Sequence, residues 1–334
     1  SVAVSQPLYT GGAVSAAVEL ARLRSDASKL TTESQRAQLR FELVGYYLEL
    51  YKHFNLRKVV ESSIASAEEV LSHIRARYDE GMALHNDITR YELLVSDLNL
   101  ELVRIDNTLA ILNSSLVTLA GLPEGTAVLP DTTILSRSLP LETEQGWQRQ
   151  ASETSPLLRL ARSGVEISRK AQRLVEAERL PKIGVQAGWT IDGPILVEVP
   201  PINRNLSYWY VGVGVKYNLS SLFKTDRSLT RSRLATRKAQ EDLSTAAQRV
   251  GLEVRAAHIR YLEAYEALKS REKSVELADS NYSNISTRYD EGMALVTEML
   301  DAADSRRSAL TGLVKARIDI IFNYYNLLFI SGTL

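Results

Sequence analysis

The chain contains no cysteine, and this absence excludes several kinds of chemistry. Without thiols there is no disulfide framework, no thiolate nucleophile and no metal site built on cysteine. A charge of one sign is also lacking, because 40 lysines and arginines balance 40 aspartates and glutamates. A nucleic-acid-binding protein needs a basic face that replaces phosphate counterions. The balanced charge therefore argues against nucleic acid as a partner.

Signatures of catalysis are lacking as well. The four histidines do not lie at metal-ligand spacing with a carboxylate or another histidine on one helix face, so packed or solvated helix residues are the simpler interpretation. There is no P-loop, no dinucleotide-binding fingerprint and no Gly-x-Ser-x-Gly elbow. We therefore expect no catalytic residue, no cofactor and no metal ion, and we expect that the protein is not an enzyme.

Long apolar runs are lacking too. The nearest candidate, around residues 318–330, is interrupted by Asn323 and Asn326 and falls short of the roughly 20 residues that a spanning helix needs. Glycine and proline are scarce from residue 13 to residue 78, where Gly45 is the only glycine. This stretch predicts one helix about 100 Å long. Such a helix needs lateral partners, because no globular core has that length.

One octapeptide occurs twice in the chain. Residues 77–84 and 288–295 both read Arg-Tyr-Asp-Glu-Gly-Met-Ala-Leu, 211 positions apart. Chance repetition is negligible in a chain this short, so the sequence contains an internal duplication. A helical pattern precedes and follows each copy. Gly81 and Gly292 therefore predict the tight turns of two long helical hairpins, because glycine tolerates the positive φ that ends a helix.

Apolar residues at steps of three and four predict the faces along which these helices pack, as in a coiled coil. In the return helix of the first hairpin these residues are Ile88, Tyr91, Val95, Leu98, Leu102, Ile105, Leu109, Leu112, Leu116 and Leu119. In the outgoing helix of the second hairpin they are Leu243, Ala247, Val250, Val254, Ala257, Tyr261, Ala264 and Leu268. In its return helix they are Leu300, Ala303, Leu310, Val314, Ile321, Tyr325 and Leu328.

Residues 182–191 and 208–217 alternate apolar with small or polar side chains, which predicts two β-strands. Aromatic residues cluster near the strand ends, a pattern typical of transmembrane β-barrels. An ordinary hairpin on a soluble core is the alternative. A barrel needs more strands than these, so the membrane interpretation requires several copies of the chain. Residues 1–9 predict a further, partial strand.

The two copies differ at their beginnings. Residues 155–192 supply a helix and a first strand to the second copy, and the first copy has no counterpart. We therefore expect that about 80–100 further residues belong before the first repeat. Residues 123–154 contain several prolines and predict an irregular segment with a short helix near residues 142–151.

Two features of the predicted turns are candidates for function. The first is an apolar tip, formed by Gly81, Met82, Ala83 and Leu84 in one copy and by Gly292, Met293, Ala294 and Leu295 in the other. This tip could dock another helical hairpin, or it could pack only against the protein's own hairpins.

The second feature is acidic, because Asp87, Glu298 and Asp301 follow the two turns. Repeated around a ring of copies, these carboxylates could line a constriction that attracts cations. Alternatively, they are carboxylates favoured at helix N-termini by the macrodipole.

Several motifs in this order resemble the TolC family of outer-membrane efflux channels. They are Arg-Tyr-x-x-Gly at both turns, Leu-Pro before the strand pair, and Pro-Leu-aromatic-x-Gly-Gly at a strand exit. The segments that carry the resemblance are 6–12, 77–121, 155–189 and 288–332. With the heptad stripes they cover most of the chain, and the order and spacing of the motifs are more specific than any one of them.

The resemblance implies a mainly α fold with a small β part. Long antiparallel helical hairpins would form an α-barrel tunnel, and the strands would join a trimeric transmembrane β-barrel. The implied division of the chain is a partial barrel strand (1–9), the first hairpin (10–122), an equatorial segment (123–154), a helix (155–181), the barrel strand pair (182–219) and the second hairpin (220–334).

The resemblance also implies a location and partners. A homotrimer would lie in the lipid of the Gram-negative outer membrane, extend into the periplasm and serve as the passive exit duct of an efflux or type I secretion system. A periplasmic adaptor (membrane fusion) protein would open its tip and connect it indirectly to an inner-membrane pump. The family's docking positions match residues 81–84 and 292–295. Its gate positions match Asp87, Tyr289, Glu298 and Asp301.

The chain departs from the family pattern, because it has only three strand segments, one of them partial, and because its tip and one strand exit differ. Some members have an arginine two residues after the tip glycine, where this chain has Ala294, so its closing network must differ. The second strand exit reads Ser-Ser-Leu-Phe-Lys-Thr and lacks the glycine pair. The alternative function is a non-membrane, structural coiled-coil scaffold. A scaffold explains the heptads but neither the strand pair nor the repeated tip.

Overall fold

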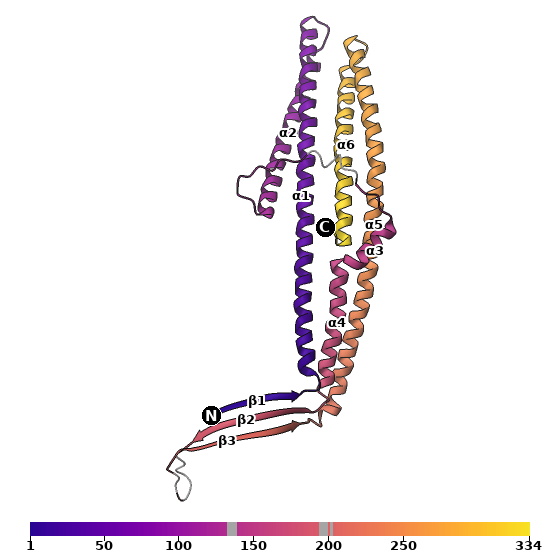
Figure 1. Ribbon diagram of the computed structural model, residues 1–334. Helices are drawn as coiled ribbons and strands as arrows, with labels where there is room; N and C mark the ends of the chain where they lie inside the picture. Colours follow the sequence, from indigo (N-terminus) through magenta and orange to yellow (C-terminus); the bar gives the residue numbers. More distant parts are fainter. Residues whose placement is uncertain (132–138, 194–199, 201–202) are drawn as a thin grey trace. The chain divides into compact units, whose positions relative to one another are not determined.

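The computed structural model describes residues 1–131, 139–193, 200 and 203–334 of the protein. Long helices account for most of these residues, and three strands form one antiparallel sheet (Figure 1). The predicted mainly α fold with a small β part is therefore confirmed. In chain order the elements are β1 (Val2–Tyr9), α1 (Ala13–Asp79), α2 (His85–Ala120), α3 (Glu144–Thr154), α4 (Pro156–Ala177), β2 (Lys182–Asp192), β3 (Leu206–Lys216), α5 (Ser221–Asp290) and α6 (Val296–Ser331).

The chain divides into two compact units, which we describe separately. The first comprises Ser1–Ser34 and Pro156–Arg249, and the second comprises Gln35–Ser155 and Val250–Leu334. Among the described residues, no helix is both long enough and apolar enough to cross a membrane.

The sheet belongs to the first unit. β2 pairs antiparallel with both β1 and β3, and the three strands lie side by side (Figure 1). The register places the alternating apolar positions of the three strands on the same face. Val4 lies opposite Ala187, and Ala187 lies opposite Val211. One face of the sheet is therefore apolar from β1 to β3. Large side chains on this face are exposed, and Trp209 has an exposed fraction of 76%.

A glycine pair connects β1 to α1. Gly11 has a φ of +66° and Gly12 a φ of +83°, a region in which other residues are strained. A Cβ added to Gly11 would also lie 2.7 Å from the Cβ of Leu180. Both conformation and space therefore require glycine at this strand exit, which gives the Gly-Gly motif a physical explanation.

The first helical hairpin lies in the second unit, where residues 35–79 of α1 pack with α2. All ten residues of the packing face predicted on α2, from Ile88 to Leu119, are buried or partly buried. The predicted packing face is therefore confirmed. α1 and α2 contribute six buried side chains to one core cluster near the turn: Ala67, Leu71, Ile74, Ile88, Tyr91 and Leu98.

The second hairpin contributes Tyr289, Val296 and Met299 to the same cluster, so the two hairpins share a core near their turns. On α6 the predicted stripe began at Leu300 and stepped through Ala303 and Leu310. These residues are only partly buried, and the buried positions lie one residue earlier, at Met299, Ala302 and Ala309. Further along the stripe Ile321 is buried, and Val314, Tyr325 and Leu328 are partly buried. The predicted stripe therefore lies on or beside the packing face of α6, and only near the turn are the most deeply buried positions one residue earlier.

The segment between the hairpins binds to one tyrosine of each hairpin. Tyr47 accepts a hydrogen bond from the backbone N–H of Asp131 at 2.7 Å, and Tyr261 donates to the carbonyl of Pro140 at 3.3 Å. Residues 132–138 of this segment lie outside the described part of the chain. The hydrogen bonds show that the segment is attached to both α1 and α5.

The short helix expected near residues 142–151 is α3, which begins after Thr143. The Thr143 hydroxyl caps the helix by accepting a hydrogen bond from the Gly146 N–H at 3.2 Å. Trp147 on α3 is only 2% exposed, and its ring lies edge-on to Tyr324 with centroids 6.4 Å apart. Gln148 donates to the Gly251 carbonyl at 2.8 Å. α3 is therefore fastened to both α5 and α6.

The burial of Trp147 generates a prediction about stability. Trp147→Ala leaves a large cavity, and a core substitution of this kind costs about 3–5 kcal/mol of the free energy of unfolding. We expect a clear fall in the midpoint of thermal unfolding, measured by circular dichroism of the helical signal in detergent. Trp209→Ala is the matched control, because the same side chain is exposed there. Equal shifts in both variants would contradict the packing role of Trp147.

Candidate functional site

The two copies of the octapeptide form the same turn. In the first copy, the Gly81 N–H donates to the Tyr78 carbonyl at 2.9 Å and the Met82 N–H donates to the Arg77 carbonyl at 2.8 Å. The equivalent distances in the second copy are 3.0 and 2.7 Å. Gly81 and Gly292 have φ values of +75° and +74°. Each glycine therefore ends one helix in the left-handed conformation, as the sequence predicts.

An acidic residue caps the helix that follows each turn. The Leu84 N–H donates to the Asp87 carboxylate at 3.2 Å, and the Leu295 N–H donates to the Glu298 carboxylate at 2.8 Å. In the opposite direction, each acid's own N–H donates to the leucine carbonyl. These carboxylates accept hydrogen bonds from backbone N–H groups at the start of α2 and α6. Their negative charge also interacts favourably with the positive end of each helix macrodipole. Asp301 lies exposed, one turn further along α6.

The apolar residues of the turns divide into an inward and an outward set. Ala83 and Ala294 pack against the core cluster that the hairpins share. The methionines and leucines beside them are exposed, with exposed fractions of 60% for Met82, 59% for Met293 and 69% for both Leu84 and Leu295. Each tip thus presents two large, flexible apolar side chains to solvent.

A groove of about 310 Å³ lies between the two turns. It is open to solvent and is lined by residues of both repeats, and its charged side chains, Arg77, Asp87 and Arg90, all belong to the first repeat. Of the predicted site residues it brings together Met82, Ala83, Leu84, Asp87, Tyr289, Gly292, Ala294 and Leu295. The predicted residues that do not line it are Gly81, Met293, Glu298 and Asp301.

Arg77 joins the two turns, and it is not among the predicted site residues. Its guanidinium donates to the backbone carbonyl of Tyr289 at 2.7 Å and lies 5.1 Å from the centre of the Tyr289 ring. Tyr289 is 6% exposed. Burial raises the pKa of its phenol, and the nearby guanidinium opposes this shift. Because Arg77 belongs to the repeated octapeptide, the repeat itself was the signal that could have identified it.

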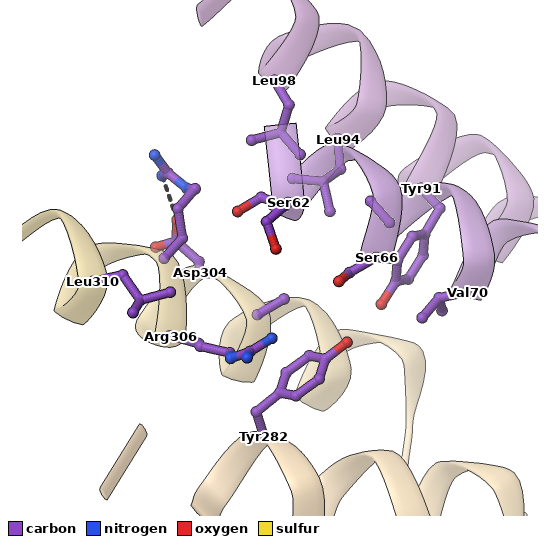
Figure 2. Close-up of a pocket in the computed structure, with 14 residues that line it drawn as sticks. Ser62, Ser66, Val70, Tyr91, Leu94, Leu98, Tyr282, Asp304, Arg306 and Leu310 are labelled. Carbon is purple, nitrogen blue, oxygen red and sulfur yellow. Dashed lines mark hydrogen bonds and ion pairs between the residues drawn. The ribbon is translucent and has the colours of Figure 1, made fainter. Parts of the chain in front are cut away.

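A second, smaller cavity of about 40 Å³ lies between the hairpins, deeper in the unit (Figure 2). Its polar lining includes Ser66, Tyr91, Tyr282 and Arg306, which come from four helices. Among the described residues, the Tyr91 hydroxyl is buried and has no hydrogen-bond partner, and burial raises the pKa of Tyr91. The cavity has room for a water molecule, which this hydroxyl would bind. Sequence periodicity marks Tyr91 as a core residue and carries no sign of this polar pocket.

Ion pairs beside this cavity connect the helices. Arg307 on α6 lies 3.0 Å from Glu101 on α2, and Arg306 lies 2.6 Å from Asp279 on α5. All four side chains are at least partly exposed, so each pair is worth little alone. In the described part of the chain, no group of three or more histidine or acidic side chains could hold a metal ion.

Comparison with known proteins identifies the chain's relatives. Residues 147–333 match the family model of the outer membrane efflux protein. The outer membrane protein TolC of Vibrio cholerae is 22% identical over 289 residues, which are 86% of this chain and 66% of that protein. The chain thus spans just under two thirds of the length of this relative.

Solved structures with the same fold are also known. The structure of VceC from Vibrio cholerae matches with a TM-score of 0.84 and 15% identity, over 99% of this chain and 78% of that chain. The CmeC outer membrane channel of Campylobacter jejuni matches with a TM-score of 0.81 and 12% identity, over 99% and 70% of the two chains. The family match covers more than half of the sequence, so the chain belongs to the family of outer membrane efflux proteins and is a TolC-like protein of the Gram-negative outer membrane that extends into the periplasm.

Proposed function

We propose that the protein is one protomer of a trimeric exit duct that serves a tripartite efflux system or a type I secretion system. The duct is a passive conduit. A periplasmic adaptor opens its tip, and a separate inner-membrane pump supplies the energy and selects the substrate. Family membership supports the role in efflux, and the observation that carries the proposal is the exposed apolar face of the sheet.

The apolar face argues for contact with lipid. Val4, Trp209 and Val213 on this face have exposed fractions of 63%, 76% and 71%. In water such a face would associate with other apolar surfaces, whereas lipid is its natural solvent in a barrel wall. Lipid hydrocarbon offers no hydrogen-bond partners to the unpaired backbone N–H and C=O groups at the edges of a sheet. Pairing of the sheet edges with those of other copies would satisfy these groups and close a barrel.

The remaining parts of the chain fit the same arrangement. Residues 1–9 and 182–219 contribute to the barrel, with the helix of residues 155–181 beside them. The hairpins of residues 10–122 and 220–334 line a helical tunnel, and residues 123–154, of which 132–138 lie outside the described part of the chain, belong to the equatorial segment. No step of this mechanism requires a catalytic group, in keeping with a family of channel proteins.

The tips are the proposed docking and gating elements. The exposed methionines and leucines at residues 81–84 and 292–295 offer an apolar ridge beside the groove. A helical hairpin of the adaptor can bury this ridge and insert into the groove, as helical partners do in other grooves. Asp87, Tyr289, Glu298 and Asp301 form the gate beside it. In a ring of copies these carboxylates favour cations at the constriction.

The first test is the native mass and membrane fraction of the full-length protein extracted in detergent. We expect a trimer in the outer membrane, because only several copies can close the sheet. A soluble dimer that needs no detergent would overturn the proposal and would favour a coiled-coil scaffold, which the heptads alone would explain.

Gly292→Trp tests the docking role of the tips. A tryptophan there strains the turn, where φ is +74°, and fills the groove. We expect loss of adaptor binding in co-purification from membranes, with the trimeric mass unchanged. Gly125→Trp is the matched control, because Gly125 has a φ of +84° and open space around it, outside the tips. Normal adaptor binding by Gly292→Trp would remove the tip from the docking mechanism.

The combination of Glu298→Gln and Asp301→Asn tests the gate. Glutamine preserves the cap of α6, because an amide oxygen also accepts from the Leu295 N–H, so the change removes charge without releasing the helix. We expect the cation preference of single channels, measured by reversal potential, to fall by at least about twofold. Glu276→Gln, at an exposed ion pair on α5, is the control. Unchanged selectivity in the double variant would leave the two acids as helix caps only.

A further inference from the structure

The face of the sheet opposite its exposed apolar face carries little charge. The strands β1, β2 and β3 contain three charged side chains in all, which are Lys182, Asp192 and Lys216. Each alternates with the apolar residues of its strand and therefore lies on the polar face of the sheet. The aspartate lies at one end of β2, and both lysines lie at the other end of the sheet.

The strand register places the two lysines directly opposite each other. Lys182 pairs with Lys216 where the chain enters the sheet after α4 and leaves it before α5. Cβ atoms at opposed positions lie about 5 Å apart, and like charges at this spacing destabilise a sheet. Both lysines are exposed, and no carboxylate in the described part of the chain forms an ion pair with either. The nearby Arg179, in contrast, pairs with Asp226 at 3.2 Å.

Both lysines line one open hollow of about 350 Å³ beside the sheet. Gly184 and Gly214 also oppose each other there, and a Cβ added to Gly214 would meet no neighbouring atom within 4 Å. The lining includes Thr10 and Gln186, whose side chains can donate hydrogen bonds. None of the described residues that line the hollow is acidic. The hollow therefore combines two positive charges with neutral hydrogen-bond donors.

This combination suits an oxyanion. A lysine ammonium group has three donors and no acceptor, and lysine binds phosphate as a compact positive charge. One anion between the two lysines would offset their mutual repulsion. Because both lysines are exposed, the attraction depends on ionic strength.

We propose that Lys182 and Lys216 form an anion-binding site on the inner wall of the barrel, where they attract the phosphate, sulfate or carboxylate groups of dissolved molecules. This inference rests on the proposed duct, in which the apolar face of the sheet contacts lipid and the opposite face borders the lumen. Several copies of the chain would repeat the lysine pair around that lumen. Rings of basic side chains favour anions in pores.

The lysine pair has an effect opposite to that of the acids that follow the turns. Asp87, Glu298 and Asp301 favour cations in the proposed gate, whereas the lysines favour anions. Removing the lysines should therefore shift the ion preference of the duct in the opposite direction to removing the acids. This difference in sign distinguishes the lysine site from a general effect of charge removal.

The reactivity of an introduced thiol measures the local potential, because the chain has no cysteine of its own. Gly214→Cys lies on the lysine face, two residues or about 7 Å along the strand from Lys216. Trimers in a lipid bilayer are treated with an anionic or a cationic methanethiosulfonate. Lys182→Gln with Lys216→Gln should lower the ratio of the anionic to the cationic rate by at least about threefold at 0.1 M salt. Both reagents react with the same thiolate, so the ratio does not depend on the pKa of the thiol.

Three controls accompany this measurement. Val213→Cys lies on the apolar face and should react with neither charged reagent, because lipid covers it. Lys29→Gln with Lys273→Gln removes the same charge from helices, where each lysine has an acidic partner at 3.0 or 2.8 Å, and should leave the ratio unchanged. At 1 M salt, where charges are screened beyond about 3 Å, the effect of the sheet lysines should disappear.

Ion selectivity provides a second measurement. In bilayers of lipid without net charge, we expect the cation preference of Lys182→Gln with Lys216→Gln to rise by at least about twofold, measured by reversal potential. Inorganic phosphate, added at constant ionic strength, should reduce the conductance of the unaltered trimer more than that of this variant.

The outcomes separate this inference from the proposed function. A rate ratio that depends on the lysines, together with a raised cation preference in the variant, supports the anion site. Trimers in which neither quantity changes when the lysines are removed overturn the site and leave the exit duct in place. If Val213→Cys reacts with the charged reagents as fast as Gly214→Cys, the apolar face is not in lipid, and the inference and the proposed function fall together.

Discussion

The structure depends on the lateral packing of helices that are too long to have a globular core. α1 and α5 contain 67 and 70 residues, and no compact domain could cover them along their length. Each can be stable only if an apolar stripe is buried along its side. The return helices α2 and α6 supply part of that cover, and the core cluster near the turns joins the two hairpins. A second cluster, in which Leu48 and Tyr51 of α1 pack with Ile318 and Ile321 of α6, joins them again further along.

The sheet follows the opposite rule, because its apolar face is exposed and not buried. In β1, β2 and β3 the register brings the apolar residues of all three strands to one face. In the proposed barrel this face of the sheet would contact lipid. This arrangement agrees with a protein of the outer membrane that extends into the periplasm.

Duplication produced two identical turns in different surroundings. Gly81 and Gly292 have nearly the same φ, yet Arg77 covers the second turn while Arg288 contacts only its own. Repetition of a sequence therefore does not repeat its contacts. The acids after the turns show the same separation of roles: Asp87 and Glu298 cap their helices in equal fashion, but only Asp87 lines the groove between the tips.

Local patterns in the sequence determined the helices, the strands, the two turns and the packing face of α2. These features depend on periodicity and on glycine conformation, which act over a few residues. The tertiary structure alone decided which residues of α6 near the turn are most deeply buried, because Met299, Ala302 and Ala309 are buried and the neighbouring Leu300, Ala303 and Leu310 are only partly buried. It alone brought Arg77 to the Tyr289 carbonyl and left the Tyr91 hydroxyl facing a cavity. These contacts join residues far apart in the chain, and no local pattern encodes which distant side chain fills a given space.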